Sequence, residues 1–238
     1  MQTETIHDLL RSMHGDSCAS GVVPVGASCY LYEAEEQFVR DAVGKRRAEF
    51  AAGRMAARIA LLRLGIPGQP ILQAADRSPI WPAGVVGSIS HAMGIAAAIV
   101  TREAHLAGLG LDIEGATPLR SDLWRHVLTE AEMRTRSASP TVAQLPRCKL
   151  TFVAKEALFK TVFPTKRVFL GFHEAQVDIA ADGTWSAKLA DAYSVLPRNM
   201  RLSNGRWACT SGLILATMAL EKEPDVAAEI EYPGHAGD

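Results

Sequence analysis

Two acidic side chains end the clearest strand pattern in the sequence, which runs over residues 108–114. Aliphatic residues alternate there with Gly108, Gly110, Asp112 and Glu114. Alternate residues of a strand share a face, so the two carboxylates project together. Such a pair repels unless a cation separates it, and it suits Mg²⁺. We expect the glycines to leave this face open to a bulky ligand. The alternative is a solvated strand end with two exposed acids.

A third acidic residue, Glu156, lies in a predicted helix over residues 149–163. It falls on the same face as Phe152 and Phe159, which we interpret as the apolar face of the helix. Burying an isolated carboxylate is costly, so Glu156 must be paired, protonated or bound to a metal. An ordinary helix pair with Lys160 is the alternative, but it does not explain why the pair lies on the apolar face.

A meeting of Glu156 with Asp112 and Glu114 explains this placement. Three carboxylates would then surround one cation, and Lys155 and Lys160 would lie beside them, ready to bind phosphate. The sequence therefore predicts a site for a metal and a phosphate group.

A short segment over residues 87–91 offers further donors for phosphate. Its backbone N–H groups, the hydroxyls of Ser88 and Ser90, and the ring of His91 are all suitable donors. Taken alone, His91 could equally be a structural residue. We interpret the other six histidines as structural, because they show no ligand spacing.

A basic cluster opens the other predicted helix, over residues 45–65. Arg47, Arg54 and Arg58 share a face of this helix, and Arg46 lies beside them. A solvated helix face is the usual explanation of such a cluster. Arg77 adds a cation in a turn rich in proline.

The remaining elements follow from periodicity and turn residues. Leu64 completes the apolar pattern of the helix over 45–65, and Pro164 is expected to end the helix over 149–163. Residues 119–136 are prone to form helix and residues 137–146 to form a loop. We expect strands over residues 85–91, 94–100, 168–179, 185–189 and 207–220, and a peripheral tail from residue 221.

The composition limits the classes of function. The net charge of −1 gives no reason to expect binding to nucleic acid or to an anionic membrane. The four cysteines show no metal-site or redox spacing. The N-terminal residues lack a signal-peptide pattern, and the longest apolar runs are too short for a membrane span. We therefore expect a cytoplasmic protein, and a monomer.

Several of these segments together resemble the 4′-phosphopantetheinyl transferase superfamily, in particular its enterobactin synthase component D group. The resemblance covers residues 45–165, half of the chain, and departs mildly at Leu111 and Val153. The matching motifs are Arg47-x-Glu49-Phe50-x-x-Gly53-Arg54, Arg77-x-Pro79-x-Trp81-Pro82, Gly87-Ser88-Ile89-Ser90-His91, Gly110-Leu111-Asp112-Ile113-Glu114 and Phe152-x-x-Lys155-Glu156-Ala157-x-x-Lys160.

This resemblance implies an α/β (α+β) fold of two similar, pseudo-symmetric halves over residues 1–107 and 108–238. Each half would have an antiparallel sheet with a long helix, and the active site would lie in the cleft between them. The implied reaction moves phosphopantetheine from coenzyme A to a serine of an acyl, peptidyl or aryl carrier protein and releases 3′,5′-ADP.

The resemblance also implies the roles of individual residues. Mg²⁺, or Mn²⁺ in its place, would be held by Asp112, Glu114 and Glu156. Asp112, Glu156 and Lys160 would be catalytic, with Glu156 or a metal-held water taking the serine proton. Coenzyme A would be bound by Arg47, Arg54, Arg77, Ser90, His91, Lys155 and Lys160, with Arg46 in competition with Arg47.

Two other functions remain open at this stage. Another coenzyme A enzyme, such as an acyltransferase, would not need three carboxylates around a metal. A non-catalytic module that binds coenzyme A or a carrier would tolerate loss of Glu156. The sequence also leaves open whether the carrier serves siderophore, polyketide, peptide or fatty-acid synthesis.

Overall fold

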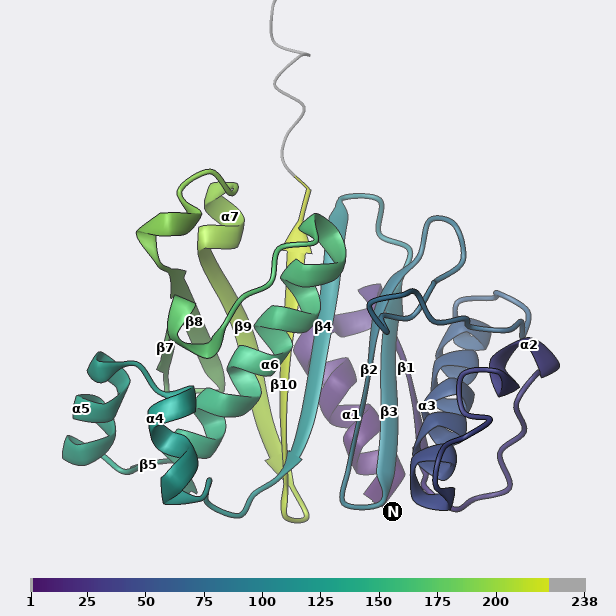
Figure 1. Cartoon of the computed structure of the whole chain (residues 1–238), viewed down its shortest axis with the longest axis horizontal. Helices are drawn as coiled ribbons and strands as arrows, with labels where there is room; N and C mark the ends of the chain where they lie inside the picture. Colours follow the sequence, from purple (N-terminus) through teal and green to yellow (C-terminus); the bar gives the residue numbers. More distant parts are fainter. Residues whose placement is uncertain (1, 223–238) are drawn as a thin grey trace, which may run out of the picture.

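The protein consists of two antiparallel sheets side by side, each covered by one long helix (Figure 1). This description rests on a computed structural model that covers residues 2–222. The first sheet has the order β1-β3-β2, with strands Ala19–Pro24, Ile95–Thr101 and Val86–Ala92. The second has the order β4-β10-β9-β8-β7, with strands Leu106–Gly115, Leu213–Glu221, Leu202–Thr210, Thr184–Leu189 and Ala175–Ile179.

The first sheet packs against helix α3 (Gly44–Arg63) through small residues. Ala52, Ala56 and Ala60 are fully buried against strands β1 and β3. The helix lies so close that a Cβ atom at Gly21 of β1 would be 2.0 Å from the carbonyl oxygen of Ala56. The small side chains of these alanines therefore determine how closely the helix packs on the sheet in this half.

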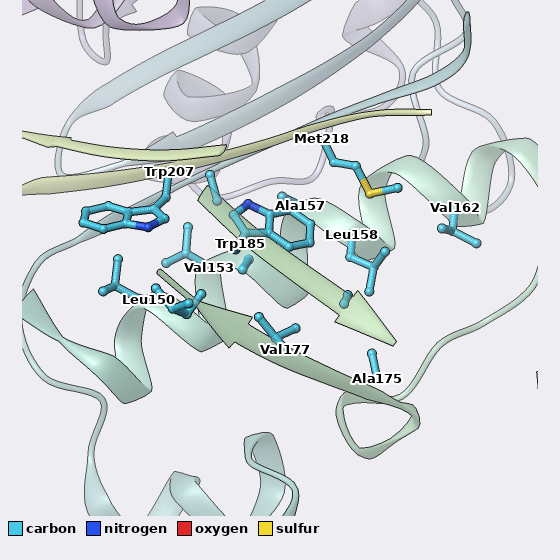
Figure 2. Close-up of a cluster of buried hydrophobic side chains, with 14 of the residues drawn as sticks. Leu150, Val153, Ala157, Leu158, Val162, Ala175, Val177, Trp185, Trp207 and Met218 are labelled. Carbon is cyan, nitrogen blue, oxygen red and sulfur yellow. The ribbon is translucent and has the colours of Figure 1, made fainter. Parts of the chain in front are cut away.

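The second sheet packs against helix α6 (Arg147–Lys166) around a larger apolar core. Figure 2 shows this core, in which Val153, Ala157 and Leu158 of α6 face Trp185 and Trp207 of the sheet. Trp185 is only 2% exposed. Its indole Nε1 still donates to the carbonyl oxygen of Arg206, at 3.1 Å, so burying the ring leaves no donor unpaired.

Serine side chains join the two sheets where β2 runs beside β4. The Ile113 N–H of β4 donates to Ser90 Oγ of β2 at 3.1 Å, and Ser88 Oγ donates to the carbonyl oxygen of Leu111 at 3.4 Å. Behind this joint, helix α1 (Gln2–His14) buries Ile6, Leu10 and Met13 against residues of both sheets. The predicted mixed fold with antiparallel sheets and two long helices is confirmed.

The shorter elements lie around these two layers. Helix α2 (Glu33–Glu36) precedes α3, and helix α7 (Arg198–Arg201) precedes β9. The region predicted to be helical over 119–136 forms two helices, α4 (Trp124–Val127) and α5 (Glu130–Ala138), because Thr129 caps the second one with its side chain. A small hairpin, β5 (Thr141–Val142) with β6 (Leu145–Pro146), occupies the expected loop.

Several predicted boundaries are wrong for identifiable reasons. Helix α6 continues through Pro164 to Lys166, because a proline removes one hydrogen bond near a helix end without preventing later ones, such as that from the Arg167 N–H to the carbonyl oxygen of Phe163. Residues 207–220 form parts of two strands, since Ser211 and Gly212 adopt positive φ angles and reverse the chain. Residues 168–174 precede β7 rather than belonging to it.

Helix α1 and strand β1 were not predicted at all. The tail expected to be peripheral falls largely on residues 223–238, outside the described residues. Within the described part of the chain, no helix is long and apolar enough to cross a membrane.

Candidate active site between the two sheets

The acidic end of β4 lies against helix α6. A Cβ atom at Gly110 would be 2.1 Å from Thr161 Oγ1 and 2.2 Å from the carbonyl oxygen of Ala157, so this face of the strand is filled by the helix. The expectation that the glycines leave the face open to a ligand is therefore wrong. They instead let the helix approach, which brings Asp112 and the side chains of α6 together.

Asp112 is the most buried acid of this site, with 4% of its surface exposed. Its Oδ1 accepts hydrogen bonds from Lys160 Nζ at 2.7 Å and from Ser90 Oγ at 3.0 Å. Its Oδ2 is buried and has no hydrogen-bond partner among the described residues. Burial raises the pKa of Asp112, while the Lys160 ammonium and the Ser90 hydroxyl oppose that rise. One carboxylate oxygen is thus available to a further ligand.

Glu114 and Glu156 complete an acidic group with Asp112. Glu114 is half-buried and forms an ion pair with Lys149, with Oε2 and Nζ 2.8 Å apart. Burial raises the pKa of Glu156, and the negative charges of Asp112 and Glu114 raise it further. The structure therefore places all three carboxylates within one another's electrostatic field.

Lys149 was not recognised in the sequence as part of this group. It precedes Glu156 by seven residues, which is two helical turns, so the helical periodicity that linked Glu156 to Phe152 could also have indicated it. Its ammonium also lies 5.1 Å from the centre of the Phe152 ring. Lys149 and Lys160 thus hold one carboxylate each.

The phenylalanine face of α6 is not the core face. Phe152, Phe159 and Phe163 are partly exposed, whereas the alanines and branched residues one position away are fully buried. The helix is apolar on most sides, and its small side chains pack closest to the sheet. Glu156 is therefore only partly buried and lines a small pocket of about 170 Å³ with Phe159 and Phe172, which corrects the interpretation made from periodicity.

A cleft of about 570 Å³ lies between the two halves at the other end of β2 and β4. Ser88 and Arg77 line it from the first half, and Lys160 and Phe159 from the second. An ion pair between Asp76 and Arg167 connects the halves at the cleft. Another cavity of about 590 Å³ lies between the end of α1 and strands β7 to β10. None of the three carboxylates lines either of these two cavities.

The cationic residues expected at the cleft include a contacting pair, His91 and Arg46, and a separate residue, Arg77. The Nε2 of His91 lies 3.3 Å from Arg46 Nη1. Burial lowers the pKa of His91, and the Arg46 and Lys160 charges add to this effect against Glu49 and Asp112. Arg77 lines the cleft, and its left-handed backbone, with φ of 70°, places it at the tip of its turn.

Arg54 is buried rather than solvated, which contradicts the simplest explanation of the basic cluster. Its guanidinium lies 4.2 Å from the centre of the Phe50 ring, and its Nε and Nη2 have no hydrogen-bond partner among the described residues. Burial lowers the pKa of Arg54 to about 10. Arg58 is also buried, and its Nη1 lies 2.9 Å from Glu35 Oε2, while its Nη2 donates to the carbonyl oxygen of Tyr30. Among the described residues, Arg58 lacks a partner only at Nε, whereas Arg54 lacks one at both Nε and Nη2.

Two expected ligands of coenzyme A have protein partners. Arg47 is exposed and forms a two-point ion pair with Glu36, at 2.5 and 2.6 Å. Lys155 is 3% exposed, and its Nζ donates to Glu132 at 2.8 Å and to the carbonyl oxygens of Val127 and Phe172. The structure therefore does not bring the ammonium of Lys155 to the three carboxylates, and its three oxygen partners leave it no free proton.

Residues 2–222 contain no group of three or more His, Cys, Asp and Glu side chains arranged as a metal site. The acids of the active site do share an electrostatic field, but Lys149 and Lys160 each hold one of them. The arrangement therefore combines anionic oxygens with two lysine cations, which suits the handling of phosphate groups.

Comparison with known proteins decides among the chemistries that such a site could perform. The model of the 4′-phosphopantetheinyl transferase N-terminal domain matches residues 34–101, and that of the 4′-phosphopantetheinyl transferase superfamily matches residues 108–210. The chain belongs to the 4′-phosphopantetheinyl transferase superfamily.

Individual relatives support the assignment of the chain to this superfamily. The 4′-phosphopantetheinyl transferase Svp of Streptomyces mobaraensis is 36% identical over 204 residues, which are 84% of this chain and 82% of the relative. PptT of Mycobacterium tuberculosis, also a 4′-phosphopantetheinyl transferase, is 33% identical over 78% of this chain and 84% of its own. Enterobactin synthase component D of Salmonella typhi is 33% identical over 58% and 57%. This phosphopantetheinyl transferase is therefore an enzyme that uses coenzyme A as its co-substrate.

Proposed function

We propose that the enzyme transfers the 4′-phosphopantetheine group of coenzyme A to a serine of an acyl, peptidyl or aryl carrier protein. Mg²⁺, or Mn²⁺ in its place, would be held by Asp112, Glu114 and Glu156, and 3′,5′-ADP would leave. The observation that carries this proposal is the unpaired, buried Oδ2 of Asp112, within the field of two further carboxylates.

The donor set fits the metal. Mg²⁺ prefers carboxylate oxygens and keeps part of its shell for water and phosphate. Asp112 Oδ2 has no donor among residues 2–222. Besides burial, the charges of Asp112 and Glu114 raise the pKa of Glu156, so a cation would relieve this repulsion. When bound, the metal would supply positive charge that stabilises the pyrophosphate oxygens during transfer.

The residues around these acids have distinct tasks in this mechanism. Lys160 would stay at the phosphate of coenzyme A and neutralise charge on its oxygens, since its Nζ is already fixed by Asp112 and Ser90. Glu156 would accept the proton of the carrier serine, because burial and the neighbouring carboxylates raise its pKa and make it a stronger base. Asp112 would orient Lys160 as well as hold the metal.

The nucleotide end of coenzyme A would be bound by residues of the first half. Arg54 has unpaired donors for the 3′-phosphate, whereas Arg47 would first have to leave Glu36. Arg46 with His91, and Arg77 in the cleft, supply further positive charge. We assign Arg46 a larger role than Arg47, and we assign Lys155 no contact with phosphate.

Three further expectations remain proposals. The two halves would divide between residues 107 and 108, the protein would act as a monomer, and it would be located in the cytoplasm. The pathway of the carrier is a question for experiment, because carrier choice depends on surface contacts.

Mass spectrometry of purified carrier proteins tests the proposal directly. The enzyme, coenzyme A and Mg²⁺ are incubated with apo forms of acyl, peptidyl and aryl carriers. A mass gain equal to one phosphopantetheine group on the carrier serine is expected, together with release of 3′,5′-ADP. Transfer of an acyl group alone from acyl-coenzyme A, without metal, would instead identify an acyltransferase.

A further inference from the structure

The first turn of helix α6 carries a lysine in an electrostatically unfavourable place. Lys149 lies in this turn and is only 8% exposed. The start of a helix bears partial positive charge, which repels an ammonium group, and burial removes the water that would solvate it. A lysine is therefore retained there only if a counter-charge offsets both costs.

Glu114 supplies this counter-charge. Its Oε2 lies 2.8 Å from Lys149 Nζ, and among residues 2–222 it is the only hydrogen-bond partner of that ammonium. Lys155, the other buried lysine of α6, is different, because its Nζ donates to three oxygens and none of them belongs to the three carboxylates of the active site. Lys149 is thus the buried lysine whose single partner belongs to the acidic group.

The two ion pairs change the charge that the acidic group offers to a metal. Lys149 pairs with Glu114 and Lys160 pairs with Asp112, so two of the three carboxylate charges are balanced. One net negative charge remains to attract a divalent cation. The pyrophosphate of coenzyme A would add the missing negative charge. The metal should therefore bind weakly by itself and more tightly with coenzyme A, and each should raise the affinity for the other.

Lys149 has two opposing effects on metal affinity. It orders the Glu114 carboxylate, which favours binding, and it places a positive charge beside a metal ligand, which disfavours binding. Glu114 is already half-buried, so ordering it further gains little side-chain entropy. The repulsion acts on both charges of a divalent cation at short range, so it is the larger effect.

We propose that Lys149 is a positioning residue that holds Glu114 before the metal binds and keeps the affinity for free metal low, so that the metal enters together with coenzyme A. This inference rests on the proposed function, in which Glu114 is a metal ligand. It assigns the lysine a task that differs from that of Lys160, which would stay at the phosphate.

The test replaces Lys149 by methionine, which removes the charge. A methionine can also keep the apolar contact with Phe152, whose ring centre lies 5.1 Å from Lys149 Nζ. Lys149→Arg keeps the charge, and Lys188→Met removes the charge of an exposed lysine of β8. Electron paramagnetic resonance of unbound Mn²⁺ gives the Kd for Mn²⁺ of each full-length protein, with and without coenzyme A. A titration of coenzyme A without enzyme corrects for the metal that it binds in solution.

Lys149→Met should bind Mn²⁺ alone about ten-fold more tightly than the wild type, because a neighbouring positive charge is gone. Added Mn²⁺ should also raise the melting temperature more in Lys149→Met than in the wild type. Lys149→Arg and Lys188→Met should match the wild type in both measurements.

An unchanged or weaker affinity of Lys149→Met for Mn²⁺ overturns the inference. A melting temperature that falls equally with and without Mn²⁺ also overturns it, since Lys149 would then act only as a structural counter-charge. Failure of the wild type to bind Mn²⁺ even with coenzyme A is a different result, and it would overturn the metal assignment in the proposed function together with this inference.

Discussion

Lys160 and Asp112 lie 2.7 Å apart, from Nζ to Oδ1, although 48 residues separate them in the sequence. This ion pair joins helix α6 to the edge strand of the second sheet, and Ser90 of the first sheet adds a hydrogen bond to the same Oδ1. It uses one oxygen of Asp112 and leaves the other without a partner in the part of the chain that the structure describes. One oxygen of the Asp112 carboxylate therefore binds the ammonium of Lys160, and the other is available as a ligand.

The first prediction concerns the metal. Asp112→Ala and Glu114→Ala should each lower carrier loading about a hundred-fold or more. Each variant removes a carboxylate ligand of the metal that would neutralise charge on the reacting phosphate. Chelator should abolish loading by the wild type, and added Mg²⁺ should restore it. Circular dichroism should show intact folds, and Asp178→Ala, at an exposed acid of β7, serves as the control. Full turnover in excess chelator would remove the metal from the mechanism.

The second prediction concerns Arg54 and the 3′-phosphate of coenzyme A. Arg54→Ala should weaken coenzyme A binding by about 1.5–3 kcal/mol, the value of a charge-assisted hydrogen bond, and should weaken dephospho-coenzyme A binding far less. Only the 3′-phosphate distinguishes the two ligands. Calorimetry with both ligands measures the difference, and Arg102→Ala, at an exposed arginine, is the control. Equal losses for both ligands would place Arg54 away from that phosphate.

The third prediction separates two effects of Glu156→Gln. Carrier loading should collapse, because a metal ligand and the proposed proton acceptor are both lost. Without Mg²⁺ and coenzyme A, the melting temperature should hold or rise, since a neutral amide is not repelled by Asp112 and Glu114. An ordinary helix ion pair with Lys160 would produce the reverse, a slightly less stable and nearly active enzyme.

The pH dependence of this stability change has a definite sign. The pKa of Glu156 is raised above 4.5 in the folded protein, so the unfolded chain releases its proton first as the pH rises. The stabilisation present below about pH 4.5 is then lost as the pH rises through the folded pKa. The melting temperatures of metal-free wild type and Glu156→Gln should therefore differ increasingly as the pH rises above this value, with the mutant the more stable of the two. A constant difference across this range would contradict the raised pKa.

The fourth prediction concerns Lys155, whose buried ion pair with Glu132 connects α6 to α5. Lys155→Met should lower the free energy of unfolding by about 3–5 kcal/mol, because Glu132 would remain buried without its counter-charge. The double variant with Glu132→Gln should recover part of this loss. Denaturant titration measures both, and Lys188→Met, at an exposed lysine of β8, is the control. If Lys155→Met were as stable as the wild type but bound coenzyme A more weakly, Lys155 would contact phosphate, as the sequence motif predicts.

The sequence by itself determined the type of chemistry and most of the central elements. The alternation over residues 108–114 and the turn residues that flank α3 produce the elements where they were predicted, because both patterns are local. The identity of the three acids also came from spacing within single elements. The family resemblance needed only the order of short motifs along the chain.

Only the tertiary structure decided which side chains share a site. Two features escaped local patterns: the packing of α6 on Gly110, which directs the helix toward the acids, and the burial of Arg54 on Phe50. Lys155 and Lys160 have the same charge and lie five residues apart, yet one is held by Glu132 and the other by Asp112. Helical periodicity fixes their relative direction, whereas the elements packed against each side of α6 fix their partners. Those elements come from distant parts of the chain, so no single segment contains this information.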